Sequence, residues 1–288
     1  MLGHPIIPIY LLDGDKPVIF DAGLSFLGEF YAEEIKAVLG DRKPAYLLLT
    51  HSHFDHCGAA ATLKQHFPGL KIMASKKAQQ ALRRPHAIAL IRELTRAAET
   101  YAHDMGLAFN GDHPFRPFEV DEVLQEGDRL EVSQGQTIQV IETPGHTWDC
   151  LSFYIRPLRA LIASEAAGQT DSNGYIFSEY LADYDQYLGS IKKMVDLGVD
   201  ILSLGHFYVY TGADASAYLQ QSLCSCEAFC QLVESNLKQA LGDMQQVMAR
   251  VRAIEYDNNS GPKQTEEAYM INLEARIKAV ARQMRVET

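Results

Sequence analysis

The chain has 288 residues, enough for one large domain or for a domain with an appendage. Apolar residues make up 47% and charged residues 22%, an ordinary globular balance. A formal charge of −11 disfavours binding to nucleic acid, because an acidic surface repels phosphate backbones. No apolar stretch approaches the length that spans a bilayer, so we expect no membrane partner either.

The start of the chain and its cysteines indicate a compartment. Residues 1–5 lack the basic segment and the apolar core of a secretory signal. The five cysteines are an odd number, without the spacing of a disulfide scaffold. We therefore expect a cytoplasmic, reduced protein.

Strands and helices alternate through the first 75 residues. Apolar runs bounded by turn residues predict strands, and apolar residues every three or four positions predict helices. The expected strands are 6–12, 18–21, 45–50 and 70–75, and the expected helices are 29–39 and 58–67. This alternation is typical of an α/β architecture.

The middle of the chain changes in character. Residues 76–105 are mainly helical and resemble an insertion on the sheet. From 120 to 163 the pattern is mostly β, with expected strands at 137–142, 151–155 and 158–163. Asp183 is expected to cap a helix that runs to about Leu197, and 200–204 is expected to be the last strand.

Two apolar stripes occupy the tail. The spacing predicts one long helix, or two helices with a break near Gly242, followed by another helix. We therefore expect one domain in residues 1–212 and a helical extension in residues 213–288. The first stripe contains Leu219, Leu223, Cys226, Cys230, Val233, Leu237, Leu241, Met244, Met248 and Val251, and the second contains Met270, Leu273, Ile277, Val280 and Met284.

The most informative segment is His51-Ser52-His53-Phe54-Asp55-His56, directly after the expected strand 45–50. Three further donors also follow expected strands: His146, Glu165 and His206. If these strands share a sheet, the donors converge at one edge, where α/β proteins usually bind ligands. Imidazoles and carboxylates gathered on rigid elements are typical of a metal site.

These residues resemble the metallo-β-lactamase superfamily over about residues 6–212. The family signature is H-x-H-x-D-H, then a histidine at a strand end, an acidic residue and a last histidine. The turn 21–23 (Asp-Ala-Gly) also looks like the aspartate turn that supports the ligands in this family. The resemblance implies an α/β fold of four layers, an αββα sandwich, here with a C-terminal helical cap.

The resemblance also implies two divalent metal ions. Their ligands would be His51, His53 and His146 in the first site and Asp55, His56 and His206 in the second, with Glu165 as the bridge. These donors suit zinc first, and iron or manganese as well. The family usually has aspartate where Glu165 stands, so occupancy of the second site depends on the reach of the longer side chain. Asp171 is the lower-ranked substitute.

The function implied is hydrolysis. Two metal ions lower the pKa of a shared water from about 15.7 toward roughly 7, and the bridging hydroxide attacks the substrate. Asp55 would bind the second metal and orient this nucleophile. Tyr208 is a candidate hydrogen-bond donor to a substrate oxygen. We expect a small ester, thioester or lactone as substrate, as in the glyoxalase II, lactonase and thioesterase-like branch of the family.

Other functions remain open at this point. An iron-dependent persulfide dioxygenase would use the same fold, whereas no flavodoxin-like domain follows for the electron transfer of a flavodiiron protein. A regulatory protein with a weakly active site is the third alternative, motivated by Glu165.

The tail and its cysteines also have alternative interpretations. The tail is similar in placement to the helical cap of the quinolone-signal response thioesterase. We expect it to cover the metal cleft, and a homodimer through the same helices is compatible with this arrangement. Cys226 and Cys230 are expected to be core residues, because both lie on the apolar stripe.

Overall fold

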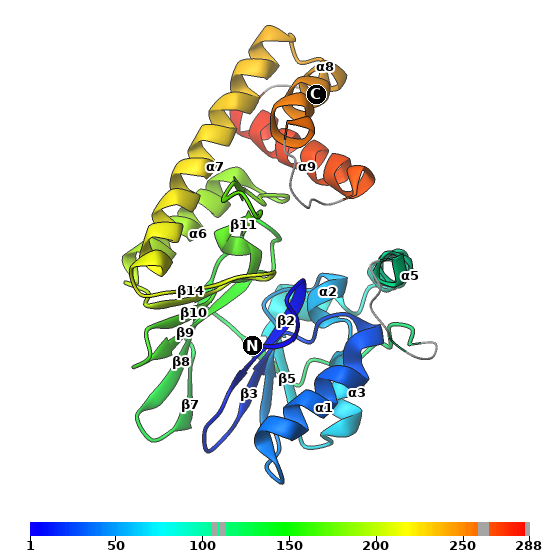
Figure 1. Cartoon of the computed structure of the whole chain (residues 1–288). Coiled ribbons are helices and arrows are strands. Elements are labelled where there is room, and N and C mark those ends of the chain that lie inside the picture. The colour runs from blue at the N-terminus through cyan, green and yellow to red at the C-terminus, as the bar shows by residue number, and fades with distance from the viewer. Residues whose placement is uncertain (105–108, 110–112, 259–264, 286–288) are drawn as a thin grey trace. The chain divides into compact units, whose positions relative to one another are not determined.

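The structure is a computed structural model that describes residues 1–104, 109, 113–258 and 265–285 (Figure 1). The chain forms two compact units. The first contains Met1–Glu142, Asp149–Ile162 and Gly205–Phe207, and the second contains Thr143–Trp148, Ala163–Leu204 and Tyr208–Thr288. The division expected at residue 212 stays a prediction.

A mixed sheet forms the centre of the first unit. Its strands lie in the order β1-β2-β3-β4-β5-β6. Strands β1 to β3 pair antiparallel, whereas β3 to β6 pair parallel. The parallel strands therefore end at the same edge of the sheet. The strands are β1 (Leu2–His4), β2 (Ile7–Leu12), β3 (Val18–Phe20), β4 (Tyr46–Leu48), β5 (Lys71–Ser75) and β6 (Glu122–Leu124).

Helices cover one face of this sheet. In Figure 1, α1 (Gly28–Leu39) and α3 (Ala60–His66) lie side by side. Ile19, Leu47 and Ile72 of the strands share a buried core with Tyr31 and Ile35 of α1. The remaining helices of this unit are η1 (Ser25–Leu27), α2 (Phe54–Cys57), α4 (Lys76–Ala81) and α5 (Pro85–Asp104).

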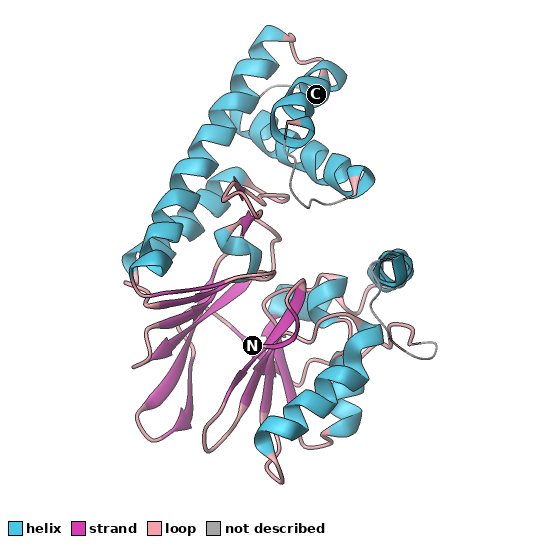
Figure 2. Cartoon of the chain, viewed as in Figure 1, coloured by secondary structure: helices cyan, strands magenta, loops and turns pink. Residues whose placement is uncertain are grey.

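An antiparallel sheet covers the other face (Figure 2). Phe20 of β3 contacts Phe153 of this second sheet, with ring centroids 5.5 Å apart. The Leu151 N–H donates to the Thr50 carbonyl at 2.8 Å. The first unit is therefore layered as helices, sheet and sheet. The strands are β7 (Arg129–Ser133), β8 (Gln136–Glu142), β9 (Leu151–Arg156) and β10 (Ala160–Ile162).

The second unit is mainly helical. A short helix, η2 (Ser164–Ala167), precedes a hairpin of β11 (Gln169–Thr170) and β12 (Ile176–Phe177). Strands β13 (Ile201–Ser203) and β14 (Val209–Thr211) pair antiparallel. The helices are α6 (Tyr184–Asp196), α7 (Ala213–Gln239, the long yellow helix of Figure 1), α8 (Met244–Arg252), the π-helix η3 (Ala253–Asp257) and α9 (Glu266–Met284).

The C-terminal helices pack onto residues 163–204 of their own chain. The Ser222 hydroxyl of α7 donates to the carbonyl of Ala167 at 2.7 Å, at the end of η2. The Arg282 guanidinium of α9 donates to the carbonyl of Ala182 at 2.7 Å. The tail therefore contacts the short helix that carries Glu165, and its expected place over the metal cleft stays a prediction.

Local sequence signals predicted several features correctly. Asp183 caps α6, accepting from the backbone N–H of Gln186 at 2.9 Å. The tail breaks where expected, between the end of α7 at Gln239 and the start of α8 at Met244. Cys226 and Cys230 are buried, with 0% and 3% exposure, which confirms the expectation that they are core residues.

Other expectations were wrong or lie beyond the described residues. Strand 200–204 is not the last, because β14 follows it with only three residues. Leu241 was placed on the apolar stripe but is 94% exposed, since the chain has already left α7 there. Residue 105 of the expected helical segment 76–105 lies outside the described residues. No helix in the described ranges is long and apolar enough to cross a membrane.

Candidate metal centre

The histidine-rich segment forms a loop that leaves β4 and enters α2. His53 is the extended residue just before α2, and Asp55 and His56 lie within that single turn. His51 and His56 are 0% and 3% exposed. The ring of His51 lies 4.6 Å from the ring of His53 and 4.3 Å from that of His56, measured between centroids. The loop therefore gathers its imidazoles in one buried place.

One carboxylate orients two of these rings. Asp21, which follows β3, accepts from the Thr50 hydroxyl at 2.8 Å and from Nδ1 of His56 at 2.8 Å. Because the hydroxyl of Thr50 donates to Asp21, it accepts from Nδ1 of His51 at 3.0 Å. Both rings then carry their proton on Nδ1 and their acceptor lone pair on Nε2. A ligand histidine is commonly oriented in this way.

The turn that carries Asp21 is tied to the histidine loop. The Ala22 N–H donates to the carbonyl of His56 at 2.7 Å. Gly23 has a φ of +62°, and a Cβ there would lie 2.3 Å from the hydroxyl of buried Tyr31. Only glycine fits this close approach, so the turn keeps Asp21 beneath the imidazoles.

The segment Gly205–Phe207 of the first unit brings His206 close to Asp55 and His56. Nδ1 of His206 donates to the carbonyl of Ile6. Its Nε2 lies 3.6 Å from Oδ2 of Asp55, and Nε2 of His56 lies 3.9 Å from that same oxygen. Two imidazole nitrogens and one carboxylate thus surround a common point.

The second unit contains two more buried candidate donors. His146 and Glu165 are 4% and 2% exposed. Nδ1 of His146 donates to the carbonyl of Glu179 at 2.7 Å, so its lone pair is also on Nε2. The Ser164 hydroxyl donates to the Glu165 carboxylate, and Ser164 has a φ of +51°, an uncommon value for a residue other than glycine.

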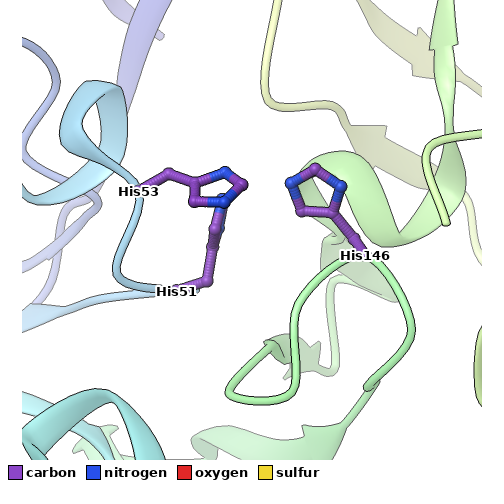
Figure 3. A group of neighbouring side chains, drawn as sticks. All are labelled: His51, His53 and His146. Atoms are coloured by element: carbon purple, nitrogen blue, oxygen red, sulfur yellow. The ribbon is translucent and has the colours of Figure 1, made fainter. Parts of the chain in front are cut away.

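Three of the predicted ligands form a group of neighbouring donors within the first unit: Asp55, His56 and His206. Their donor atoms lie within 4.8 Å of one another. Figure 3 shows the rings of His51 and His53, which belong to the same loop. His146 and Glu165 belong to the second unit, and their part in the metal site stays a prediction.

The chemistry of these residues fits a divalent metal ion. Imidazole nitrogens and carboxylate oxygens are ligands for zinc, iron and manganese. Nδ1 of His51, His56, His146 and His206 is engaged by a protein oxygen, which presents Nε2 as the ligand atom. Which of the seven residues bind a metal stays a prediction that this fit supports.

Three other polar residues have different surroundings. The carboxylate of Asp149 accepts from the backbone N–H of Ser52 at 2.9 Å, so it fixes the loop. Asp171 accepts from the N–H of Asn173 at 2.8 Å in a turn, and no donor group of the described residues includes it. Tyr208 is half-buried and stacks on Tyr210 at 6.0 Å. Its catalytic role stays a prediction.

Cys57 is a packing residue next to the histidine loop. Its side chain is fully buried, and its thiol donates to the Ser52 carbonyl at 3.5 Å. Burial, with the nearby carboxylates, raises the pKa of the thiol well above its ordinary value. A thiol held protonated in this way is a poor nucleophile.

Sequence reasoning missed the residues that support the second unit's donors. Glu179 acts through its backbone carbonyl, and Tyr187 reaches the site only through hydrogen bonds to backbone groups. Neither contact produces a sequence motif, because every residue has a backbone carbonyl. Thr50, which contacts His51 in the first unit, was also missed, and its place directly before His51 was the available signal.

Comparisons with known proteins identify a family. A family model described as the metallo-beta-lactamase superfamily matches residues 3–206. Hydroxyacylglutathione hydrolase GloC of Haemophilus influenzae is 29% identical over 57% of this chain and 69% of its own length. A putative diflavin flavoprotein of Nostoc is 25% identical over 68% of this chain. The chain spans about a third of the length of such diflavin flavoproteins, 32% in this case.

Solved structures share the fold. A metallo-beta-lactamase family protein of Thermus thermophilus aligns with a TM-score of 0.62 and 23% identity, over 98% of this chain and 92% of that one. An archaeal superfamily protein of Sulfolobus tokodaii aligns with a TM-score of 0.58 and 21% identity, over 98% and 93%. The αββα sandwich expected from the sequence is thereby confirmed.

Proposed function

Because the chain belongs to the metallo-beta-lactamase superfamily, we propose that it is a metal-dependent hydrolase of a small ester, thioester or lactone. The observation that carries the proposal is the convergence of Asp55, His56 and His206 within the first unit. Their donor atoms lie within 4.8 Å of one another, supported by Asp21 and by a backbone carbonyl.

The chain's own residues prepare this centre. A bound divalent metal ion would lower the pKa of water and polarise the substrate's carbonyl oxygen. Asp21 holds Nδ1 of His56 protonated, and the Ile6 carbonyl does the same for His206, so each Nε2 remains an acceptor. Burial of His51 and His56 restricts water around the donors, which strengthens electrostatic interactions there. Tyr208 is the proposed hydrogen-bond donor to a substrate oxygen.

We infer the class of substrate from the chemistry of its leaving group and from the name of one relative. A thiolate or an alkoxide leaves with little assistance, whereas an amine needs a proton from a general acid. The name of GloC states hydrolysis of an acylglutathione, in which the acyl group is bonded to sulfur. We therefore rank thioesters first, followed by lactones and other esters.

The test combines metal analysis with a substrate panel. Protein purified without added metal is analysed for its elements and then assayed with a thioester, a lactone and a phosphoester. We expect bound divalent metal and turnover of an acyl substrate. His56→Ala should lower kcat/KM at least about 100-fold, equivalent to about 2.7 kcal/mol.

The matched control is His66→Ala. His66 is a surface histidine paired with Glu29 at 2.7 Å, and its substitution should leave kcat/KM unchanged. A fully metal-loaded protein that turns over no member of the panel would refute the proposal.

The alternative function is an iron-dependent oxidoreductase. The similarity to diflavin flavoproteins supports it. Bound iron, together with oxygen consumption in the presence of a persulfide and no acyl hydrolysis, would establish the alternative. Zinc with thioester turnover and no oxygen consumption would exclude it.

A further inference from the structure

Tyr187 of α6 joins the two segments that carry the second unit's donors. Its side chain is 0% exposed. The hydroxyl donates to the carbonyl of Glu165 at 3.0 Å and accepts from the N–H of Glu179 at 3.1 Å. The carbonyl of Glu179 in turn accepts from Nδ1 of His146 at 2.7 Å. One buried hydroxyl therefore links the backbone of Glu165 to the residue that orients His146.

The backbone around Tyr187 also forms the floor of the turn that carries His146. Gly145 has a φ of +133°, and a Cβ there would lie 2.3 Å from the Cα of Tyr187. The N–H groups of Ala182 and Asp183 donate to the Gly145 carbonyl at 3.0 and 3.2 Å. The Ser190 hydroxyl donates to the carbonyl of Pro144 at 2.8 Å. Helix α6 thus fixes this turn from several directions.

The side chain of Glu165 has one more rotatable bond than that of an aspartate, so its carboxylate has more rotamers to restrict. Fixing the main chain of Glu165 removes one source of variation in where the carboxylate lies. The Glu165 carbonyl accepts from the N–H of Gly168 at 3.0 Å as well as from Tyr187. The Gly168 bond lies within the local turn, whereas the Tyr187 bond ties that turn to α6.

We propose that Tyr187 is a positioning residue for the metal centre, whose hydroxyl sets the placement of Glu165 and, through Glu179, of His146. It touches neither substrate nor metal, and it acts through two backbone groups. The inference rests on the proposed function in requiring that these residues bind metal. Outer partners of this kind typically contribute 10- to 100-fold to metal affinity.

Tyr180 provides a matched control. It is also 0% exposed, and its ring centroid lies 5.7 Å from that of Tyr187. Its hydroxyl has no hydrogen-bond partner among the residues that the structure describes. Burial raises the pKa of both phenols well above the ordinary value, so both remain protonated. Substitution by phenylalanine removes the hydroxyl at both positions. The Tyr187 hydroxyl makes two hydrogen bonds, whereas the Tyr180 hydroxyl makes none with the described residues.

The experiment measures the dissociation constant for Co²⁺ by competition with a chromophoric chelator, using the metal-free full-length chain. Tyr187→Phe should weaken binding about 10- to 100-fold and alter the visible spectrum of bound Co²⁺. Tyr180→Phe should stay within about twofold of the wild type and keep its spectrum. Trp148, the chain's only tryptophan, lies two residues after His146, so its emission reports on the same turn.

The outcomes separate this inference from the proposed function. Absence of metal binding by the wild type would refute the proposed function itself. Wild-type affinity in Tyr187→Phe, or an equal loss in both variants, would overturn the positioning role alone. If Tyr187→Phe does not fold, Ser190→Ala tests the same platform: we expect a several-fold weaker affinity, and an unchanged affinity would overturn the inference.

Discussion

Asp21 shows how much of the site depends on one buried residue. Its carboxylate accepts from the backbone N–H of Thr50 at 2.7 Å, from the hydroxyl of Thr50 and from Nδ1 of His56. Its φ of +59° is an uncommon value for a residue other than glycine and costs of order 1–3 kcal/mol. Aspartate tolerates this conformation better than most residues. The surrounding hydrogen bonds therefore hold Asp21 in a strained backbone conformation, in which its carboxylate orients His56 directly and His51 through Thr50.

We predict that Asp21→Asn weakens metal binding by about 10- to 100-fold, because an amide cannot accept from all the donors that the carboxylate satisfies. Chelator competition measures this loss. Asp13→Asn is the control, since Asp13 lies at the surface and pairs with Arg42. Equal affinities in the two variants would contradict the role assigned to Asp21.

At the scale of elements, a buried ion pair holds the helical tail together. Arg276 of α9 and Glu255 of η3 are 1% and 4% exposed and form a two-pronged pair at 3.0 and 2.7 Å. The hydroxyls of Tyr269 and Tyr175 donate to the same carboxylate at 2.8 and 3.0 Å. The Arg276 guanidinium also lies 4.4 Å from the ring centroid of Phe229. This pair connects α9 and α7 to the loop that precedes β12.

We predict that Arg276→Met lowers the free energy of unfolding by about 3–5 kcal/mol, because it leaves the Glu255 carboxylate buried without its cation. Urea unfolding followed by the helical circular dichroism signal measures the change. Lys278→Met, two residues away, removes an exposed partner of Glu274 and should cost about 0.3–0.5 kcal/mol. Similar losses of unfolding free energy in both variants would show that the buried pair contributes no more to stability than the exposed pair.

Most side chains of the two apolar stripes in the tail are buried within the chain itself. Leu219, Val233, Leu273 and Ile277 are each at most 1% exposed. A homodimer through these helices therefore stays a prediction that needs other residues for its contact. Among the described residues of the tail, the large apolar side chains that are exposed are Leu241, Ile254 and Ile271, with 94%, 52% and 62% exposure.

At the scale of the whole molecule, the predicted ligands come from stretches separated by more than a hundred residues. His56 and His206 lie far apart in the sequence, yet their donor atoms lie within 4.8 Å of one another. A metal that binds only the folded chain stabilises it, because binding removes folded protein from the unfolding equilibrium. The effect is about 2.7 kcal/mol at a metal concentration 100 times the dissociation constant.

We therefore predict that chelation lowers the melting temperature by several degrees and that added Zn²⁺ restores it. Differential scanning calorimetry at increasing Zn²⁺ concentrations measures the shift. The His56→Ala variant should respond much less, whereas His66→Ala should respond like the wild type. A melting temperature that is independent of metal in the wild type would contradict the prediction.

The sequence by itself determined the features that depend on neighbouring residues. The strand before His51, the helix cap at Asp183 and the break near Gly242 all rest on local chemistry and spacing. The candidate metal ligands were likewise visible, because a loop of three histidines and an aspartate is typical of a metal site. Short strands such as β11 and β14 were not predicted, since two or three residues carry no periodic pattern.

Only the tertiary structure decided which groups support the donors. The carbonyls of Ile6 and Glu179 orient His206 and His146, but a backbone carbonyl is identical at every position of a sequence. The hydroxyl of Tyr187 and the buried charge of Arg276 acquire their roles from partners brought together by folding. The sequence states the type of each side chain directly. It does not state which distant residues will become its hydrogen-bond partners, because folding brings those together.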